Sequence, residues 1–130
     1  MHWPEHTLDP TGTIDWSTPG RLQRIICGKT TLTVEVENPK KAQVVSLRTH
    51  GEKSKRKGTA RAAMEHLCSL SDHQGAILSL LASPLTKKTR LPRLVRFYDS
   101  LGFRPTGRTG NWAGDPIMVR QPVSSAVIGI

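Results

Sequence analysis

The sequence predicts a single domain of α+β or α/β class, with a mixed, mostly antiparallel central sheet flanked by helices. The chain has 130 residues, which fits one domain over residues 1–130. Two apolar segments separated by a short turn predict an antiparallel pair of strands. A strand–helix–strand succession from 42 to 82 adds a parallel step, because such a crossover returns the chain in the same direction.

The first two predicted strands cover residues 30–37 and 42–49. In "TTLTVEVE" the residues Leu32, Val34 and Val36 alternate with polar residues, which is typical of a half-buried strand. "NPKK" turns the chain, and "AQVVSLRT" is rich in β-branched residues. Residues 1–20 are rich in Pro, Gly and Thr and are expected to be mostly loop, with room for one short strand.

A helix and a buried strand are expected next. Small and apolar residues recur at helical spacing over 59–74, and Gly75 ends the pattern. The run "AILSLLA" (76–82) is short and apolar, as in a strand covered on both faces.

The C-terminal third begins with a predicted helix over 91–101. It has an apolar stripe, Pro92 in its first turn, and Gly102 where a left-handed residue suits the end of a helix. The remaining segments are expected as a turn-rich link, a strand, and an apolar tail that forms a further strand or docks: 105–115, 116–122 and 123–130.

The chain is strongly basic, with 19 Lys and Arg against 10 Asp and Glu and a net charge of +9. This balance favours an anionic partner such as nucleic acid or a phosphorylated cofactor. Much of the excess lies in two blocks, 48–61 and 87–96, and each leads into a predicted helix. Aromatic residues are few and do not interleave with the basic ones, as a base-stacking surface requires.

Cysteines and apolar runs indicate the compartment. Cys27 and Cys68 are too few for a disulfide framework and match no metal-ligand spacing, so we expect a reducing compartment and no metal site. No apolar run approaches the roughly 18 residues of a membrane helix, and the first ten residues do not resemble a signal peptide. The expected location is the cytoplasm, with no membrane partner.

A basic, glycine-containing loop joins the strand at 42–49 to the helix at 59–74. The first amides of a helix lack internal partners and the helix dipole adds positive charge, so this junction suits a phosphate group. In "KRKGTA" (55–60) Gly58 lets the backbone approach a ligand. The spacing is neither that of a P-loop nor G-x-G-x-x-G, so a nucleoside triphosphatase or a nicotinamide enzyme is not expected.

"KRKGTA" resembles the [Q/R]-x-x-G-x-[G/A] signature of the GCN5-related N-acetyltransferases (GNAT). "LPRLVRFYDSLGF" (91–103) is similar to the later motif of that family, a helix with a Phe-Tyr pair that ends in Leu-Gly-Phe. The resemblance covers roughly residues 30–120 in the order of elements. It implies an acyl-coenzyme A acyltransferase fold trimmed at the N-terminus. It also implies an enzyme that moves an acetyl group directly from acetyl-coenzyme A to a primary amine.

The resemblance also implies roles for particular residues. Tyr98 would protonate the departing thiolate, whereas its place on the apolar stripe alone would make it a core residue. The backbone at 47–49 would pair with the pantetheine arm and polarise the thioester carbonyl. Arg90, Arg93 and Arg96 are expected either to reach the adenosine 3′-phosphate or to face solvent. The positions implied in binding acetyl-coenzyme A are Leu47, Arg48, Thr49, Lys55, Arg56, Lys57, Gly58, Thr59, Ala60 and Arg93.

Other assignments stay open in the sequence. Glu35, Glu37 and His50 are candidates for the general base by position only, and each is otherwise an ordinary surface residue. The expected partners are acetyl-coenzyme A, an unidentified amine acceptor (small molecule or protein), and a second copy in a homodimer. The alternatives are a small basic nucleic-acid-binding protein and a catalytically inactive binding module with the same fold.

Overall fold

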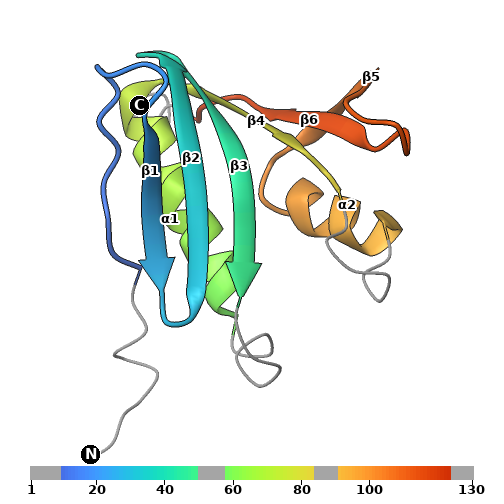
Figure 1. Ribbon diagram of the computed structural model, residues 1–130, viewed down its shortest axis with the longest axis horizontal. Helices are drawn as coiled ribbons and strands as arrows, with labels where there is room; N and C mark the ends of the chain where they lie inside the picture. The colour runs from blue at the N-terminus through green and yellow to red at the C-terminus, as the bar shows by residue number, and fades with distance from the viewer. Residues whose placement is uncertain (1–9, 50–57, 84–90, 124–130) are drawn as a thin grey trace, which may run out of the picture.

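The structure is a computed structural model that describes residues 10–49, 58–83 and 91–123. Its elements in chain order are β1 (Leu22–Cys27), β2 (Thr30–Asn38), β3 (Lys41–Thr49), α1 (Thr59–Gln74), β4 (Ile77–Leu81), α2 (Leu91–Asp99), β5 (Arg104–Thr109) and β6 (Pro116–Arg120). The six strands form one sheet in the order β1-β2-β3-β4-β6-β5 (Figure 1). Among the described strands only β3 and β4 pair in parallel, which confirms the predicted mixed sheet.

Strand β1 was not predicted from the sequence. It pairs antiparallel with β2, from Leu22 opposite Glu35 to Cys27 opposite Thr30. The two residues between the strands start with Gly28, whose φ is 58°. Positive φ in a two-residue loop is the geometry that favours glycine in hairpins. Gly28 is therefore the feature of the sequence that could have indicated the hairpin of β1 and β2.

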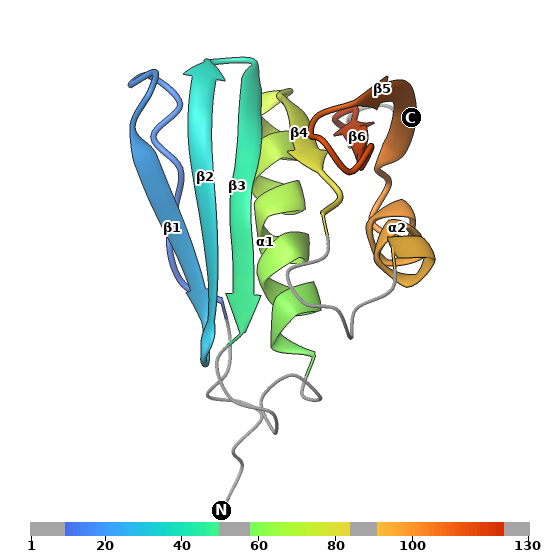
Figure 2. The same ribbon diagram turned by 45° about the vertical axis from the view of Figure 1, so that its right-hand side comes forward.

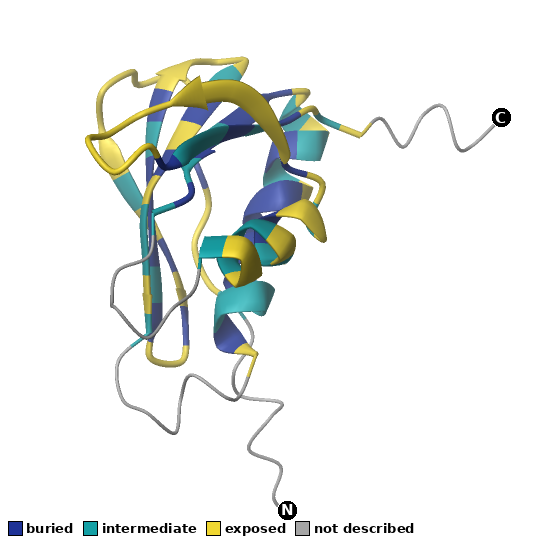
Figure 3. Cartoon of the chain, turned by 90° about the vertical axis from the view of Figure 1, so that its right-hand side faces the viewer, coloured by how far each residue is buried: buried dark blue, intermediate teal, exposed yellow. Residues whose placement is uncertain are grey.

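Strand β5 corrects the prediction of a turn-rich link over 105–115. All of its residues are exposed (Figure 3), and its pairing with β6 is irregular between Pro105 and Thr109. Proline and glycine are typical of such an edge strand. Because neither face of β5 is buried, its sequence has no alternation of apolar and polar residues from which a strand could be predicted.

The core lies between α1 and one face of the first three strands (Figure 2). From the helix, Met64 and Leu67 are fully buried at helical spacing. From the strands, Ile25, Leu32 and Val34 meet them with no exposed surface. The 3.6-residue period of the helix and the two-residue period of the strands therefore meet in one apolar layer.

The sheet opens where β3 and β4 separate. Their ladder runs from Lys41 opposite Ile77 to Val44 opposite Leu80, although β3 continues to Thr49. A bulge at Val45 falls at the same point, because Val34 pairs with Val44 and the preceding residue of β2 pairs with Ser46. Bulges bend and twist a strand. In Figure 1, β4 turns away from the end of β3.

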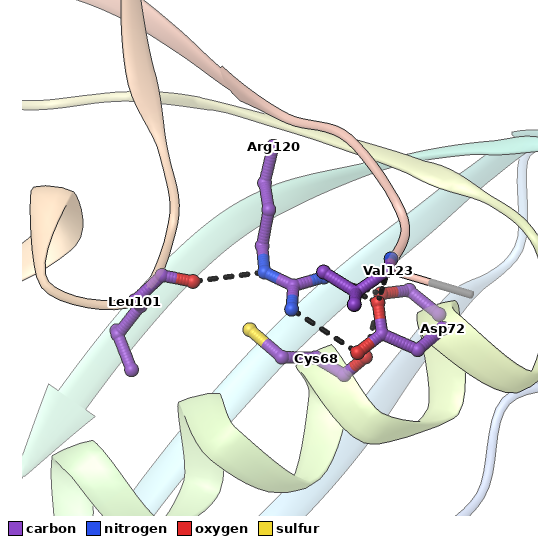
Figure 4. Close-up of polar contacts among 6 residues, drawn as sticks. Cys68, Asp72, Leu101, Arg120 and Val123 are labelled. Atoms are coloured by element: carbon purple, nitrogen blue, oxygen red, sulfur yellow. Dashed lines mark hydrogen bonds and ion pairs between the residues drawn. The ribbon is translucent and has the colours of Figure 1, made fainter. Parts of the chain in front are cut away.

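Arg120 on β6 contacts the C-terminal end of α1 and the segment that follows α2 (Figure 4). Its guanidinium donates to both carboxylate oxygens of Asp72, at 2.8 and 3.1 Å, and its Nε donates to the carbonyl of Leu101 at 2.8 Å. Asp72 also accepts the amide of Val123. Burial alone would raise the pKa of Asp72, but these hydrogen bonds and the Arg120 charge outweigh it and lower that pKa.

Three further expectations concern membrane helices, the apolar tail and the number of domains. Neither α1 nor α2 is long and apolar enough to cross a membrane. Of the apolar tail, residues after Val123 lie outside the described residues. The expectation of one domain over residues 1–130 stays a prediction.

Candidate functional site

Helix α1 begins with an open N-terminus. It follows Gly58, whose φ of 73° is left-handed, and the first helical hydrogen bond is donated by the Ala62 amide to the Gly58 carbonyl at 3.0 Å. Among the described residues no side chain caps this end, and the first turn of α1 holds no acid. The amides of residues 59–61 therefore have no partner within the helix, which is the arrangement that attracts an anion.

Gly58 stands at the opening itself. A Cβ built on it has no described atom within 4 Å, so the described structure leaves open space at this position. The predicted position of Gly58, Thr59 and Ala60 at a helix start is thus confirmed by the geometry, while their role in binding stays a prediction.

Three threonine hydroxyls tie this helix start to the end of β3. The Oγ1 of Thr30 lies 2.5 Å from that of Thr49 and 2.7 Å from that of Thr59. Thr30 has no exposed surface and Thr59 is 4% exposed. We call Thr30, Thr49 and Thr59 the threonine trio. It holds three elements together at the place where β3 has parted from β4.

The end of β3 presents backbone beside this helix start. Leu47 pairs with Leu32 and packs against the core, whereas Arg48 is exposed and pairs with Thr31. Thr49 is half-buried. Beyond Val44 the strand has left the ladder with β4. A ligand with amide groups could add along that side in the manner of a further strand.

Tyr98 lies on α2 and is 7% exposed. Its ring makes edge-on contacts with Phe97 and Phe103, at centroid distances of 5.3 and 5.9 Å. Burial raises the pKa of its phenol, which therefore stays protonated at neutral pH. Among the described residues, its hydroxyl forms no hydrogen bond. A buried polar group without a partner is rare and calls for an explanation.

Arg61 connects the two helices, a role that the sequence analysis did not assign. Its guanidinium stacks over the Phe97 ring at 5.2 Å and donates to the Ser100 hydroxyl at 2.6 Å. The first turn of α1 is thereby fixed against the segment that carries Tyr98. In the sequence Arg61 was only one member of a basic block, because nothing local distinguishes a stacked arginine from a solvated one.

The other predicted site residues are scattered or lie outside the description. Arg93 and Arg96 are exposed on α2. Glu37 pairs with Lys41 at 3.4 Å, and Glu35 lies opposite Gln43, toward the start of β3 and away from Thr49. The residues outside the described ranges are His50, Lys55, Arg56, Lys57 and Arg90.

The thiol of Cys68 does not resemble a nucleophile. The residue is buried, and burial raises its pKa to about 11 despite the nearby Arg120. A thiol in that state carries almost no thiolate at neutral pH. Within residues 10–49, 58–83 and 91–123 no group of three metal-ligating side chains is found.

A cavity of about 410 Å³ lies elsewhere, between the end of α2 and the β5–β6 pair. Gly102, Arg104, Thr106 and Arg120 contribute to its lining. Both arginines are already in ion pairs, Arg104 with Asp99 at 2.7 Å and Arg120 with Asp72. Because its cations are occupied, we do not place the functional site there.

Solved structures resemble the fold as a whole. The ribosomal-protein-S18-alanine N-acetyltransferase from Escherichia coli is 20% identical, with a TM-score of 0.58 over 85% of this chain and 79% of that one. Ard1 from Thermoplasma volcanium is 17% identical, with a TM-score of 0.61 over 79% and 71%. The PaiA N-acetyltransferase from Thermoplasma acidophilum, in complex with coenzyme A, is 13% identical, with a TM-score of 0.56 over 77% and 59%. Comparisons with protein-family models and with curated proteins found no match.

Proposed function

We propose that this chain, which has the fold of the GCN5-related N-acetyltransferases, transfers an acetyl group from acetyl-coenzyme A to a primary amine. The observation that carries the proposal is Tyr98, a nearly buried phenol with no hydrogen-bond partner among the described residues. Its phenol is protonated at neutral pH, so a proton is available for a strongly basic leaving group such as a thiolate.

The start of α1 and the end of β3 are the proposed binding surface for coenzyme A. The open amides after Gly58 would hold the diphosphate, with charge support from the adjoining basic residues. The backbone from Leu47 to Thr49 would hold the pantetheine arm. A solved structure of the same fold contains coenzyme A, which supports this choice of ligand.

The chain's own groups would do three things in the reaction. Backbone at the end of β3 would orient the thioester and offer an amide to its carbonyl oxygen. Holding thioester and amine together would supply much of the rate. Tyr98 would then protonate the thiolate that leaves as coenzyme A. The described residues place no carboxylate or imidazole as an evident base, so we expect the amine to lose its proton through water.

We expect the acceptor side to be open. Residues 10–21 form no helix, and Leu22, Ile26 and Val45 are each close to half exposed on the described part of the sheet. Trp112 is fully exposed on a turn that hydrogen bonds between Asn111 and Asp115 hold in place. Because residues 10–21 form no helix and these apolar side chains are accessible, we expect an amine on a macromolecule rather than a small metabolite.

The first experiment compares acetyl-coenzyme A with nucleic acid as a ligand. We expect acetyl-coenzyme A at 100 times its Kd to stabilise the folded chain by about 2.7 kcal/mol, measured by thermal unfolding. Duplex DNA and RNA at the same phosphate concentration are the controls. Stabilisation by nucleic acid alone, falling steeply with salt, would instead support the nucleic-acid-binding alternative.

The second step of that experiment separates an enzyme from an inactive binding module. Acetyl-coenzyme A is incubated with panels of peptides, polyamines and small amines, and mass spectrometry follows a gain of one acetyl group. Binding without acetyl transfer to any amine would leave a binding module of this fold.

A further inference from the structure

The threonine trio is joined by hydrogen bonds between its hydroxyl groups. Its central member, Thr30, lies within hydrogen-bonding distance of both Thr49 and Thr59, which belong to β3 and α1. Among the described residues, these three hydroxyls have no other hydrogen-bond partners. The three hydroxyl groups carry three protons, but only two hydrogen bonds join them. One hydroxyl proton is therefore not used in a hydrogen bond within the trio.

Burial decides where the spare proton lies. Thr30 has no exposed surface and Thr59 is 4% exposed, so a spare proton on either would be a buried donor without an acceptor. Leaving such a donor unsatisfied costs about 1–3 kcal/mol. Thr49 is the only member that is half-buried. The favoured order is thus Thr59 donating to Thr30, Thr30 donating to Thr49, and Thr49 donating outward.

We infer that Thr30 is a positioning residue for coenzyme A. It fixes the start of α1 against the end of β3, and it orients the Thr49 hydroxyl so that its proton points to an oxygen acceptor on the bound nucleotide thiol. The inference rests on the proposed function. Thr30 itself touches no substrate in this scheme, because it is completely buried beneath the two residues that it aligns.

The test replaces Thr30 with valine, which keeps the shape of the side chain and removes its hydroxyl. Thr30→Val breaks both contacts of the trio, and we expect the Kd for coenzyme A to rise about tenfold, equal to about 1.4 kcal/mol. Titration calorimetry with coenzyme A measures this without a known acceptor. Thr30→Ser retains the hydroxyl and is expected to restore the wild-type affinity.

Thr33→Val is the matched control. Thr33 lies on the same strand, is 9% exposed, and forms no hydrogen bond through its hydroxyl within the described residues. Urea unfolding of each variant reports the loss of stability separately. If Thr30 were only structural, folded Thr30→Val would bind coenzyme A as tightly as Thr33→Val does, and the inference would be overturned.

A second variant covers the case in which Thr30→Val does not fold. Thr59→Val removes only the contact between Thr30 and Thr59, and a weaker affinity for coenzyme A is again expected because the start of α1 is no longer fixed against the end of β3. Unchanged affinity in that variant overturns the inference and leaves the proposed function intact. A wild-type chain that binds no coenzyme A overturns both.

Discussion

Tyr98 combines two properties that ordinary core residues do not share. It is nearly buried among Phe97 and Phe103, yet its hydroxyl has no hydrogen-bond partner in the described part of the chain. A phenylalanine would fill the same space without a polar atom to desolvate. The hydroxyl is therefore unfavourable for stability, which is expected where function rather than folding determines the residue.

Tyr98→Phe should separate these two roles. We expect turnover to fall at least ~100-fold, since a general acid supplies that much. Coenzyme A affinity should be unchanged, because the phenol lies outside the proposed diphosphate and pantetheine contacts. Stability should stay level or rise by about 1 kcal/mol, because the hydroxyl forms no hydrogen bond in the part of the chain that the structure describes. Acetylation rates with the acceptor found in the amine screen, together with urea unfolding, measure both effects.

The opposite pattern would identify Tyr98 as a core residue. In that case Tyr98→Phe would acetylate at the wild-type rate across the pH range, and the proposed chemistry would need another acid.

At the scale of elements, the proposed coenzyme A site lies at the end of β3 and the start of α1. The strand leaves its ladder with β4 after Val44, and the next described helix starts at Thr59 with open amides. Arg61 and the threonine trio hold that start against α2 and β3. The junction is thus positioned from two sides, as a preorganised binding surface requires.

Gly58→Ala tests the junction. Its φ of 73° strains any L side chain by about 1–2 kcal/mol, and the residue directly precedes the open amides of α1. Gly20→Ala is the control, because Gly20 has a φ of 84° and, like Gly58, nothing within 4 Å of a built Cβ. Both variants should lose similar stability in urea, but only Gly58→Ala should lose coenzyme A affinity, by more than tenfold.

Equal affinity for coenzyme A in the two glycine variants would show that the start of α1 is not the diphosphate site.

At the scale of the whole molecule, Arg120 and Asp72 connect α1, the end of α2 and β6. Arg120 is 7% exposed, so its charge depends on the carboxylate for compensation. Removing one partner of a buried ion pair is more damaging than removing an exposed pair, since it leaves a charge without water or counter-ion.

Asp72→Asn should therefore destabilise the fold by about 2 kcal/mol at pH 7, less than the loss for a fully buried pair, because the Asp72 side chain is 27% exposed. The pKa of Asp72 is lowered from 3.8, so its contribution is complete above that value and is lost as the pH falls through the lower folded pKa. The difference between wild type and Asp72→Asn should shrink below pH 3.8. Urea unfolding at pH 7 and pH 3 measures it.

Asp99→Asn is the control for the whole-molecule prediction. Asp99 pairs with Arg104, but both side chains are more than half exposed, so little stability should be lost. A similar loss in the two variants would contradict a special role for the buried pair.

The sequence by itself determined the elements whose residues bury a face or cap a helix. Leu32, Val34 and Val36 revealed β2, and Gly58 and Gly75 bracketed α1, because burial and left-handed turns leave local patterns. The motif at 91–103 also predicted a helix that carries Tyr98, which α2 confirms, while the catalytic role of Tyr98 stays a prediction.

Only the tertiary structure decided what depends on neighbours distant in the chain. It showed that β5 pairs without a buried face, that β3 and β4 part after Val44, and that the Tyr98 hydroxyl has no hydrogen-bond partner within the described residues. The threonine trio joins residues up to 29 apart. Such contacts arise from packing between elements, and a threonine or an arginine in the sequence looks the same whether its partner is water or another buried side chain.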